Sequence, residues 1–576
     1  MSTLPSAAAK KIRIGDLLVE NGLITAEQLQ HALSEQRRLG AKLGRTLIDL
    51  GMVSENDMLA LLSRQLAIPL IDLRSYRFDP ALVRMLPETL ARRFRSIVLK
   101  EEGGAYLVGM ADPTDLFAFD ELARVLGREV RLALVREDEV LRTFDGVYRK
   151  TDEISSLAQE LSEEVTGDGA LDIAQLGFGE DSADAPVVKM LQSLFVDAVQ
   201  MGASDIHIEP DTDCLRLRQR IDGVLVEQVI REKQIAAALV LRLKLMAGLN
   251  ISEKRLPQDG RFQIGVRGKS VDVRLSTMPV QHGESVVMRL LDQGGALLDL
   301  ERLGMPAPIL ARFRNVLRSP SGMILVTGPT GSGKTTSLYA ALQSLNEPER
   351  KIITVEDPVE YRLPRISQVQ VNPKIGLDFS SVLRSALRQD PDVILVGEMR
   401  DQETAEIGLR AAMTGHLVLS TLHTNDAVGT ADRLVDMGAP GYLLAASLRC
   451  IIAQRLVRRV CESCGERHSP SANDLAWLAG MRPGAGADTL RQGRGCQHCN
   501  GTGYRGRVAV YEYLEPTLDM LDALRRGQHD GFVHAASRAP LYRSLAQAAL
   551  DYALDGVTTL EEAKRIGGEL APLSER

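Results

Sequence analysis

Four short runs of apolar residues stand in the middle of the chain, at residues 323–326, 352–355, 393–396 and 417–420. They lack the alternation of polar and apolar residues that marks a half-exposed strand. Continuous apolar runs are typical of parallel strands buried on both faces. Residues 335–345, which follow the first run and a glycine-rich turn, read as the start of a helix. The pattern predicts an α/β core over residues 296–458.

The N-terminal pattern differs because it repeats. The apolar positions and glycines of residues 13–36 recur 29 residues later, in residues 42–65. Each copy reads as a short helix, a turn marked by Gly22 or Gly51, and a second amphipathic helix. Two copies are too few for a solenoid. We therefore predict a helical tandem-repeat domain over residues 1–70.

Three further patterns divide the rest of the chain. Strand-like residues 95–99 and 105–109 predict an α+β remainder of the N-terminal domain over 71–150. Ten acidic and no basic residues between 151 and 186 predict a partly disordered acidic linker over 151–184. Short strands at 215–218 and 271–275 predict a second N-terminal α+β domain over 185–295. Beyond the core we expect a cysteine-containing subdomain over 459–512 and a helical region over 513–576.

Composition narrows the function classes. The net charge of −7 and the pI of about 5.9 argue against a nucleic-acid-binding surface. Six cysteines in 576 residues do not form a secreted disulfide framework. The chain has no run of about 18 apolar residues, and residues 1–12 lack the apolar core of a signal peptide. The sequence therefore predicts a cytosolic protein that meets membranes only through partners.

The turn after the first apolar run carries the strongest chemical signal. Residues 328–335 read Gly-Pro-Thr-Gly-Ser-Gly-Lys-Thr, a complete P-loop between a strand and a helix. Its glycines let backbone N–H groups surround a phosphate at the helix N-terminus. Lys334 is expected at the β- and γ-phosphates and Thr335 at Mg²⁺. The predicted ATP-binding residues are Gly328, Pro329, Thr330, Gly331, Ser332, Gly333, Lys334, Thr335 and Thr336. The alternative, a glycine-rich turn that binds nothing, is disfavoured by this setting.

Hydrolysis needs acidic groups beside the phosphates, and the other apolar runs supply them. Glu356 follows one run, Glu398 follows the next, and His423 follows the last. The carboxyl ends of parallel strands meet at one edge of a sheet, which faces the ligand. Any one acid after a strand is more often a solvated loop residue. Their occurrence after two strands of a P-loop domain favours a catalytic site.

Four of the cysteines form two C-x-x-C pairs, Cys461/Cys464 and Cys496/Cys499, with 31 residues between the pairs. Two such pairs can give one metal four thiolates, which favours structural Zn²⁺. A redox role is weaker because no thioredoxin-like βαβ pattern surrounds them. Four unligated thiols remain the alternative.

Several segments together resemble the secretion ATPases of type II secretion and type IV pili. They are Gly-Pro-Thr-Gly-Ser-Gly-Lys-Thr-Thr at 328–336, Ile-Thr-Val-Glu-Asp-Pro-Val-Glu at 353–360, Asp-Pro-Asp-Val-Ile-Leu-Val-Gly-Glu-Met-Arg-Asp at 390–401 and Thr-Gly-His-Leu-Val-Leu-Ser-Thr-Leu-His-Thr-Asn at 414–425. The resemblance implies a multidomain α/β protein with a RecA-like P-loop core, a preceding small PAS-like α+β domain and a tetracysteine zinc subdomain. It also implies that Glu356 is the catalytic carboxylate, Glu398 the Walker B acid and His423 the γ-phosphate sensor.

The same resemblance implies the partners and the work done. Arg274 and Arg289 align with arginines that reach the nucleotide from the preceding domain. The family forms hexameric rings that drive fibre assembly through an inner-membrane platform. A type II secretion ATPase is the first reading and a type IV pilus extension ATPase the second. A retraction motor is disfavoured by the long N-terminal region and the cysteine site.

Two readings from other classes stay open. A nucleic-acid translocase on the same core is disfavoured by the acidic balance. A cyclic di-GMP-binding module with a silent ATPase is disfavoured because Lys334, Glu356 and Glu398 are all present.

The repeat resembles a tandem domain that binds cyclic di-GMP in some of these ATPases. Arg13 can pair with a phosphate and stack on guanine, whereas Lys42, its equivalent, lacks the planar bidentate fork. The predicted ligand residues are Arg13, Ile14, Leu29, Leu33, Gln36, Lys42, Leu43, Met58, Leu62 and Gln65. The alternative is a helical hairpin that docks on a partner.

Overall fold

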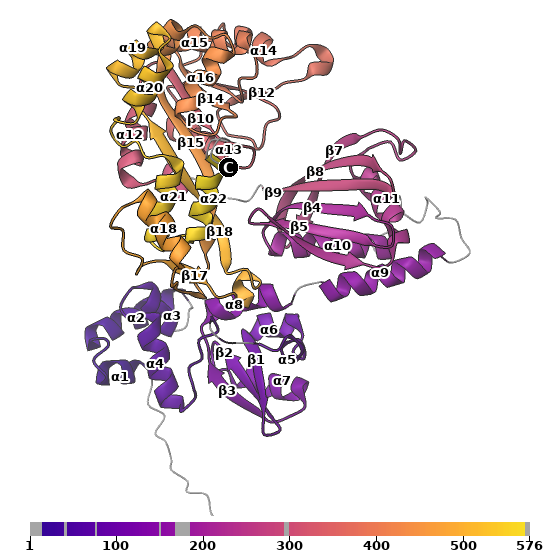
Figure 1. The fold of residues 1–576 in the computed structure, drawn as a ribbon. Helices are drawn as coiled ribbons and strands as arrows, with labels where there is room; N and C mark the ends of the chain where they lie inside the picture. The colour runs from indigo at the N-terminus through magenta and orange to yellow at the C-terminus, as the bar shows by residue number, and fades with distance from the viewer. Residues whose placement is uncertain are drawn as a thin grey trace, which may run out of the picture. The chain divides into compact units, whose positions relative to one another are not determined.

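The structure is a computed structural model, and it describes residues 14–39, 43–74, 76, 78–148, 151–166, 185–292 and 299–570. Residues 1–149 belong to one compact unit and nearly all of the remaining chain to a second. Each unit is described by itself (Figure 1). Within the described ranges, we find no helix with the length and apolar character needed to cross a membrane.

The first unit opens with two helix pairs, α1 (Ile14–Glu20) with α2 (Ala26–Leu39) and α3 (Leu43–Asp49) with α4 (Glu55–Leu66). The second pair starts 29 residues after the first, from 14 to 43 and from 26 to 55, so the sequence repeat is also a structural repeat. Equivalent residues fill one core, including Leu18 with Leu47 and Ile24 with Val53. Gly22 and Gly51 both have positive φ in the turns.

An α+β segment completes this unit. Strand β1 (Ser96–Glu102) pairs antiparallel with β2 (Ala105–Met110), and β2 pairs parallel with β3 (Val130–Leu134). The two strands expected near 95–99 and 105–109 are thus confirmed. The helices are α5 (Pro80–Arg84), α6 (Glu88–Phe94), α7 (Leu116–Leu126) and α8 (Glu137–Val147).

The prediction of a partly disordered linker is wrong for its first half. Residues Thr151–Thr166 form helix α9. Ile154, Leu157, Ala158 and Leu161 lie on one helical face and pack in the same core as α10 (Pro186–Gln200). The acidic residues belong to the exposed face of this helix, and the high acid content of the segment obscures its apolar stripe. Residues 167–184 lie outside the described part of the chain.

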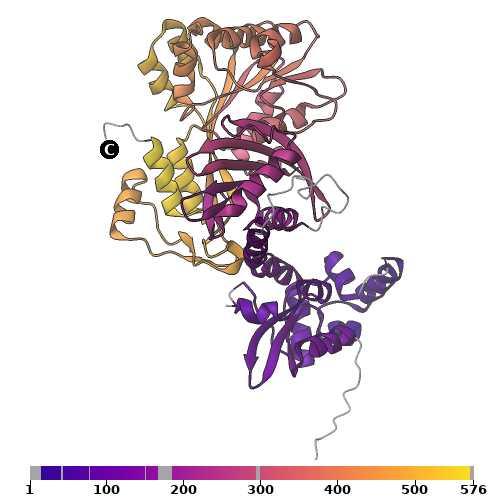
Figure 2. The ribbon, with the colours of Figure 1, turned by 90° about the vertical axis from the view of Figure 1, so that its right-hand side faces the viewer.

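The second α+β domain is a six-stranded antiparallel sheet in the order β6-β5-β4-β9-β8-β7. Helices α10 and α11 (Ala236–Met246) pack on one face, where Ile206 and Ile208 point. The alternating residues Asp205, His207 and Glu209 belong to the opposite face. The sheet is drawn in magenta in Figure 2. Its strands are β4 (Ala203–Pro210), β5 (Leu215–Ile221), β6 (Val224–Ile230), β7 (Gln258–Val266), β8 (Lys269–Val280) and β9 (Gly283–Asp292), with a 3-10 turn at Lys233–Ile235.

The predicted parallel sheet is confirmed and is larger than expected. Its order is β12-β11-β13-β14-β10-β15-β18, with the first six strands parallel and β18 antiparallel to β15. The strands are β10 (Gly322–Thr327), β11 (Ile352–Glu356), β12 (Ser367–Gln370), β13 (Val393–Val396), β14 (Leu417–Leu422), β15 (Leu448–Val460) and β18 (Tyr504–Leu514). The helices are α12 (Ala307–Leu317), α13 (Lys334–Leu345), α14 (Phe379–Ala386), α15 (Gln402–Met413), α16 (Val428–Asp436) and α17 (Gly441–Ser447), with 3-10 turns at Leu300–Leu303 and Pro373–Ile375.

The cysteine subdomain is an insertion between two strands of this sheet. The range predicted for it, 459–512, includes most of β18, which instead pairs with β15. The cysteine spacing alone gives no sign of where the sheet resumes. The remaining elements are β16 (Gly465–Arg467), α18 (Ala472–Met481), β17 (Arg491–Gly493), a 3-10 turn at Gln497–Cys499, α19 (Leu518–Arg526), α20 (His529–Ala536), α21 (Leu545–Leu554) and α22 (Leu560–Leu570).

Candidate functional site

The P-loop connects β10 to α13, and its backbone requires glycine. Gly328, Gly331 and Gly333 all have positive φ. A Cβ at Gly328 would lie 2.4 Å from the carbonyl oxygen of Gln454, and one at Gly333 would lie 2.8 Å from Gln454 Nε2. Because β15 presses against the loop so closely, side chains at these positions would force it open.

Gln454 was not predicted from the sequence, yet it supports this loop from behind. It is 2 % exposed. Its Nε2 donates to the carbonyl of Ser332 at 2.8 Å, and its Oε1 accepts from Ser337 Oγ at 2.8 Å. One amide therefore ties the P-loop to the first turn of α13. Nothing in the spacing of the sequence marks this residue, since the contact spans more than 100 positions.

Two polar groups of the loop fit a bound phosphate. The buried Ser332 Oγ has no hydrogen-bond partner among the described residues. Lys334 Nζ donates to the carbonyls of Gly328 at 2.6 Å and Pro329 at 3.0 Å. Burial lowers the pKa of Lys334 to about 8. A phosphate in the loop would restore a strong counter-charge to this ammonium group. The P-loop residues therefore fit the triphosphate of ATP.

The parallel sheet brings Glu398 and His423 together, as the strand-end pattern predicts. Strands β13 and β14 are neighbours, and His423 Nε2 lies 3.5 Å from Glu398 Oε2. Glu398 also forms an ion pair with Arg400. Burial and the nearby Lys334 charge lower the pKa of His423. A neutral imidazole keeps one N–H donor, which can form a hydrogen bond to a γ-phosphate oxygen.

Glu356 ends β11, but its carboxylate is turned into a buried network. The residue is 4 % exposed. Its oxygens accept hydrogen bonds from Tyr339 and Thr354, and from Gln368 Nε2 at 3.3 Å. Tyr339 lies on α13, directly after the P-loop. The structure thus places Glu356 at the predicted sheet edge and adds two partners, Tyr339 and Gln368, that the sequence pattern did not reveal.

The two predicted arginines face each other across β8 and β9. Arg274 Nη2 lies 2.7 Å from Glu360 Oε2 and donates to the carbonyl of Val359 at 3.3 Å. Arg289 Nε lies 3.1 Å from Asp205 Oδ1. Arg261, opposite Arg274 on β7, was missed. Together they line a cavity of about 380 Å³ that also contains Pro358. Arg274 therefore touches the segment after Glu356, whereas Arg289 is held within its own domain.

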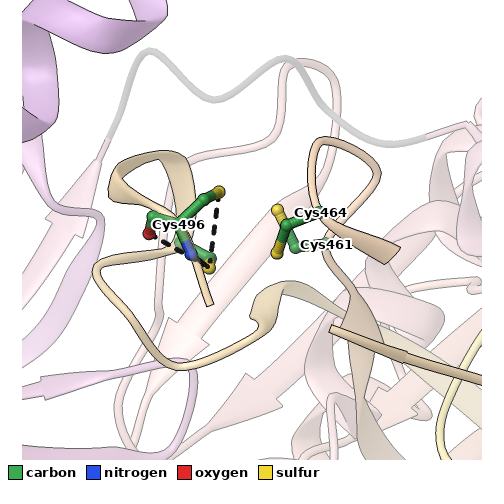
Figure 3. A group of neighbouring side chains, drawn as sticks. Cys461, Cys464 and Cys496 are labelled. Carbon is green, nitrogen blue, oxygen red and sulfur yellow. Dashed lines mark hydrogen bonds between the residues drawn. The ribbon is translucent and has the colours of Figure 1, made fainter. Parts of the chain in front are cut away.

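The four cysteines predicted as metal ligands lie together (Figure 3). The sulfur atoms of Cys461, Cys464, Cys496 and Cys499 all lie within 4.8 Å of one another. Cys496 Sγ and Cys499 Sγ are 3.7 Å apart. Tetrahedral zinc with Zn–S bonds of about 2.3 Å separates its sulfurs by about 3.8 Å. Three of the four residues are buried. The donor set and spacing therefore fit Zn²⁺.

The predicted cyclic di-GMP residues are less fully described. Arg13 and Lys42 lie outside the described residues, as does the side chain of Ile14. Leu29, Leu43, Met58 and Leu62 belong to the apolar core of the repeat or pack against it. Leu33 and Gln36 are half-buried, and Gln65 is exposed. The described apolar side chains account for the packing of the repeat, and the ligand site stays a prediction.

Known proteins match nearly the whole chain. The family model described as "Type II/IV secretion system protein" matches residues 180–565, and the "MshEN domain" model matches residues 66–154, which begin where the repeat ends. The type IV pilus assembly ATPase PilB of Myxococcus xanthus is 42% identical over 574 residues, 97% of this chain and 99% of that protein. Type II secretion system protein E of Xanthomonas campestris pv. campestris is 40% identical over 560 residues, 96% of this chain and 98% of that protein.

A solved structure supports the fold. The ATPase DotB of Legionella pneumophila matches with a TM-score of 0.50 and 21% identity, over 66% of this chain and 95% of that chain. A likeness at this identity concerns the fold alone. The family model and the two full-length relatives go further, because they cover the P-loop, the strand-end acids and the cysteines in one alignment. The chain belongs to the type II/IV secretion system protein family and is an ATPase for secretion or pilus assembly.

Proposed function

We propose that this ATPase hydrolyses MgATP to drive assembly of a pseudopilus for type II protein secretion. The observation that carries the proposal is the meeting of the P-loop, Glu398 and His423 at one edge of the parallel sheet. A type IV pilus extension ATPase is the second candidate, favoured by the 42% identity to a PilB protein. Both candidates use the same chemistry and differ in the fibre that is assembled.

In this proposal each residue of the site has a separate role in ATP binding or hydrolysis. The backbone N–H groups of 328–335 and Lys334 hold the β- and γ-phosphates, and Thr335 and Glu398 would hold Mg²⁺. Mg²⁺, when bound with ATP, neutralises phosphate charge. His423 contacts the γ-phosphate, and Glu356 leaves its bonds to Tyr339 and Gln368 to orient the attacking water. Arg274 and Arg289 supply charge to the transferring phosphoryl group once the two domains close.

The proposal extends to assembly and ligands. The chain acts as a cytoplasmic homo-hexamer, peripheral at the inner membrane, and passes motion to a platform protein there. This rests on the resemblance and on relatives named for secretion and pilus assembly.

The proposed zinc ion is structural and is held by Cys461, Cys464, Cys496 and Cys499. The spacing of their sulfur atoms supports this. The N-terminal repeat binds cyclic di-GMP as an allosteric ligand, supported by its two equivalent halves.

One cell experiment separates the candidates. A deletion strain is complemented with the wild-type chain or with Lys334→Ala, and the secreted proteins in the medium and the pili sheared from cells are measured together. Loss of secretion with intact pili supports type II secretion, and the reverse supports pilus extension. If Lys334→Ala restores both, the motor proposal is wrong. Turnover that depends on added DNA would instead indicate a nucleic-acid translocase.

A further inference from the structure

A buried carboxylate lies away from the nucleotide, at the meeting point of three elements. Glu512 is on β18 and is 1 % exposed. Its Oε1 accepts the backbone N–H of Ala427 at 2.8 Å, and its Oε2 accepts that of Leu545 at 3.0 Å. Ala427 is the N-cap of α16 and Leu545 the first residue of α21. One side chain therefore accepts hydrogen bonds from backbone N–H groups at two helix N-termini, where these groups have no partner within their own helix.

The loop that Glu512 holds is the one that carries His423. Only three residues separate His423 from Ala427. Thr424 Oγ1 is 2.5 Å from Thr327 Oγ1 at the end of β10, and the carbonyl of Asn425 accepts from Arg455 Nη2 at 3.0 Å. The end of the loop is also bonded to α16: the carbonyl of Asp426 accepts from Thr430 Oγ1 at 2.8 Å, and Asp426 Oδ1 accepts from the N–H of Gly429 at 2.6 Å. These bonds tie the loop to the helix that follows it, whereas the Glu512 bond to Ala427 ties the loop and the start of α16 to β18.

We infer that Glu512 is a positioning residue for ATP hydrolysis, holding the His423 loop against the strand edge and tying it to the C-terminal helix α21. The inference rests on the role proposed for His423. With both oxygens accepting, the ionised carboxylate holds Ala427 and Leu545 at once. A protonated carboxyl must use one oxygen as a donor, so its grip on one of these N–H groups weakens.

The protonation state of Glu512 changes within the working pH range. Burial raises the pKa of Glu512 to about 7; the N–H of Ala427 opposes this rise, the charge of Asp426 adds to it, and hydrogen bonds from Leu545 and Tyr542 oppose it. Asp426 lies in the His423 loop, and Tyr542 precedes α21. Above about pH 7 the group is ionised and both bonds form. Turnover therefore increases with pH through this value.

The test compares steady-state turnover of the full chain and Glu512→Gln between pH 6 and 8.5. Glutamine has one acceptor oxygen, so it mimics the protonated acid. The ratio of wild-type to variant kcat is expected near one at pH 6 and roughly five- to tenfold above pH 8, the size of one typical net hydrogen bond. The KM for ATP should stay within about twofold, because the P-loop is untouched. A ratio that is flat with pH overturns the inference, as does an effect confined to KM.

Glu562→Gln is the matched control. Glu562 is also 1 % exposed and accepts from the backbone N–H of Arg458 at 2.9 Å, but it does not contact the His423 loop. Burial alone would raise its pKa, yet hydrogen bonds from Arg565 and Arg458 lower it below the ordinary value. Glu562 therefore stays ionised from pH 6 to 8.5. Its kcat ratio should be flat over this range, whatever the loss of stability.

Two further variants keep the inference decidable. If Glu512→Gln does not fold, Tyr542→Phe replaces it: losing a hydrogen bond to the carboxylate raises the pKa of Glu512, so the midpoint of the kcat profile should move to higher pH. An unmoved midpoint overturns the inference. His423→Ala tests the underlying role separately. Full turnover in that variant refutes the role of His423, whereas an inactive His423→Ala with a flat Glu512→Gln ratio refutes only the role of Glu512.

Discussion

The edge of the parallel sheet and the N-terminal helical repeat were both predicted as ligand sites, but the structure treats them differently. At the sheet edge, Glu398 and His423 come from different strands and lie 3.5 Å apart. In the repeat, four of the apolar residues predicted to contact a ligand, Leu29, Leu43, Met58 and Leu62, belong to the core of the repeat or pack against it. The two residues assigned to its phosphates, Arg13 and Lys42, lie outside the described part of the chain.

The difference follows from how each fold sets its geometry. Parallel register places the ends of β10, β13 and β14 side by side, so residues that follow these strands must share one edge. In a helical pair, the apolar stripe fixes only which face is buried. Six of the predicted ligand residues lie within α2 and α4, where helical periodicity does not specify which side chains meet a ligand. The residues that follow parallel strands can therefore be used to predict a ligand site. The pattern of a helical repeat predicts mainly which residues form its apolar core.

The largest expected effect comes from breaking the sheet-edge site. Lys334→Ala should abolish turnover by removing the contact to the β- and γ-phosphates, and Glu398→Ala should abolish it while ATP still binds. Turnover and nucleotide affinity are measured together. We expect a loss of about 10³-fold or more in kcat for each, from the usual weight of such groups. Near-normal turnover in either variant would contradict the assignment.

The arginines should show the second-largest effect, because in the proposed mechanism they act on the phosphoryl group once the two domains close. Arg274→Ala and Arg289→Ala should lower kcat by about 10²–10³-fold and leave ATP affinity nearly unchanged, since their charge is needed in the transition state. Arg216→Ala is the control: Arg216 lies on β5 of the same sheet and pairs with Asp211 and Glu227. Weaker ATP binding with unchanged kcat would show that the arginines only grip the ground state.

Only part of the fold and of the candidate site can be predicted from the sequence. The P-loop, the parallel strands and the pairing of Glu398 with His423 could be predicted, because each rests on a local motif or on register. Tyr339, Gln454 and Glu512 could not, because each contacts residues far along the chain through tertiary packing. Helix α9 is a different case: its apolar stripe is present in the sequence, but the acidic composition of the segment obscures the helical periodicity.

The cysteine cluster should respond more modestly, and mainly in stability. Purified protein should contain about one zinc ion per chain by elemental analysis. Cys496→Ser should loosen the segment between β15 and β18, lower the unfolding temperature and release zinc, while ATP still binds at the P-loop. Cys214→Ser is the control, because Cys214 is outside the cluster. Fresh, reduced protein without metal would refute the zinc site.

The smallest effect on ATP turnover is expected from changes in the repeat. Measuring cyclic di-GMP binding there decides whether this region is a ligand site. Cyclic di-GMP has two phosphates and two bases, and a two-fold repeated domain can contact half of it with each copy. Arg13 can grip a phosphate bidentately, whereas Lys42 acts as a point charge. Arg13→Ala should therefore nearly remove binding, and Lys42→Arg should tighten it by about two- to fivefold.

Calorimetry on the full chain measures both changes, and Arg64→Ala serves as the control because Arg64 is an exposed residue near the end of α4. Equal affinity in wild type and Arg13→Ala would show that the equivalent positions do not hold the phosphates. If folded wild-type protein shows no binding at tens of micromolar ligand, a Kd range that a weak two-phosphate site should reach, the repeat is a docking surface. Of the two regions compared, only the sheet edge, whose site is fixed by strand register, would then bind a ligand.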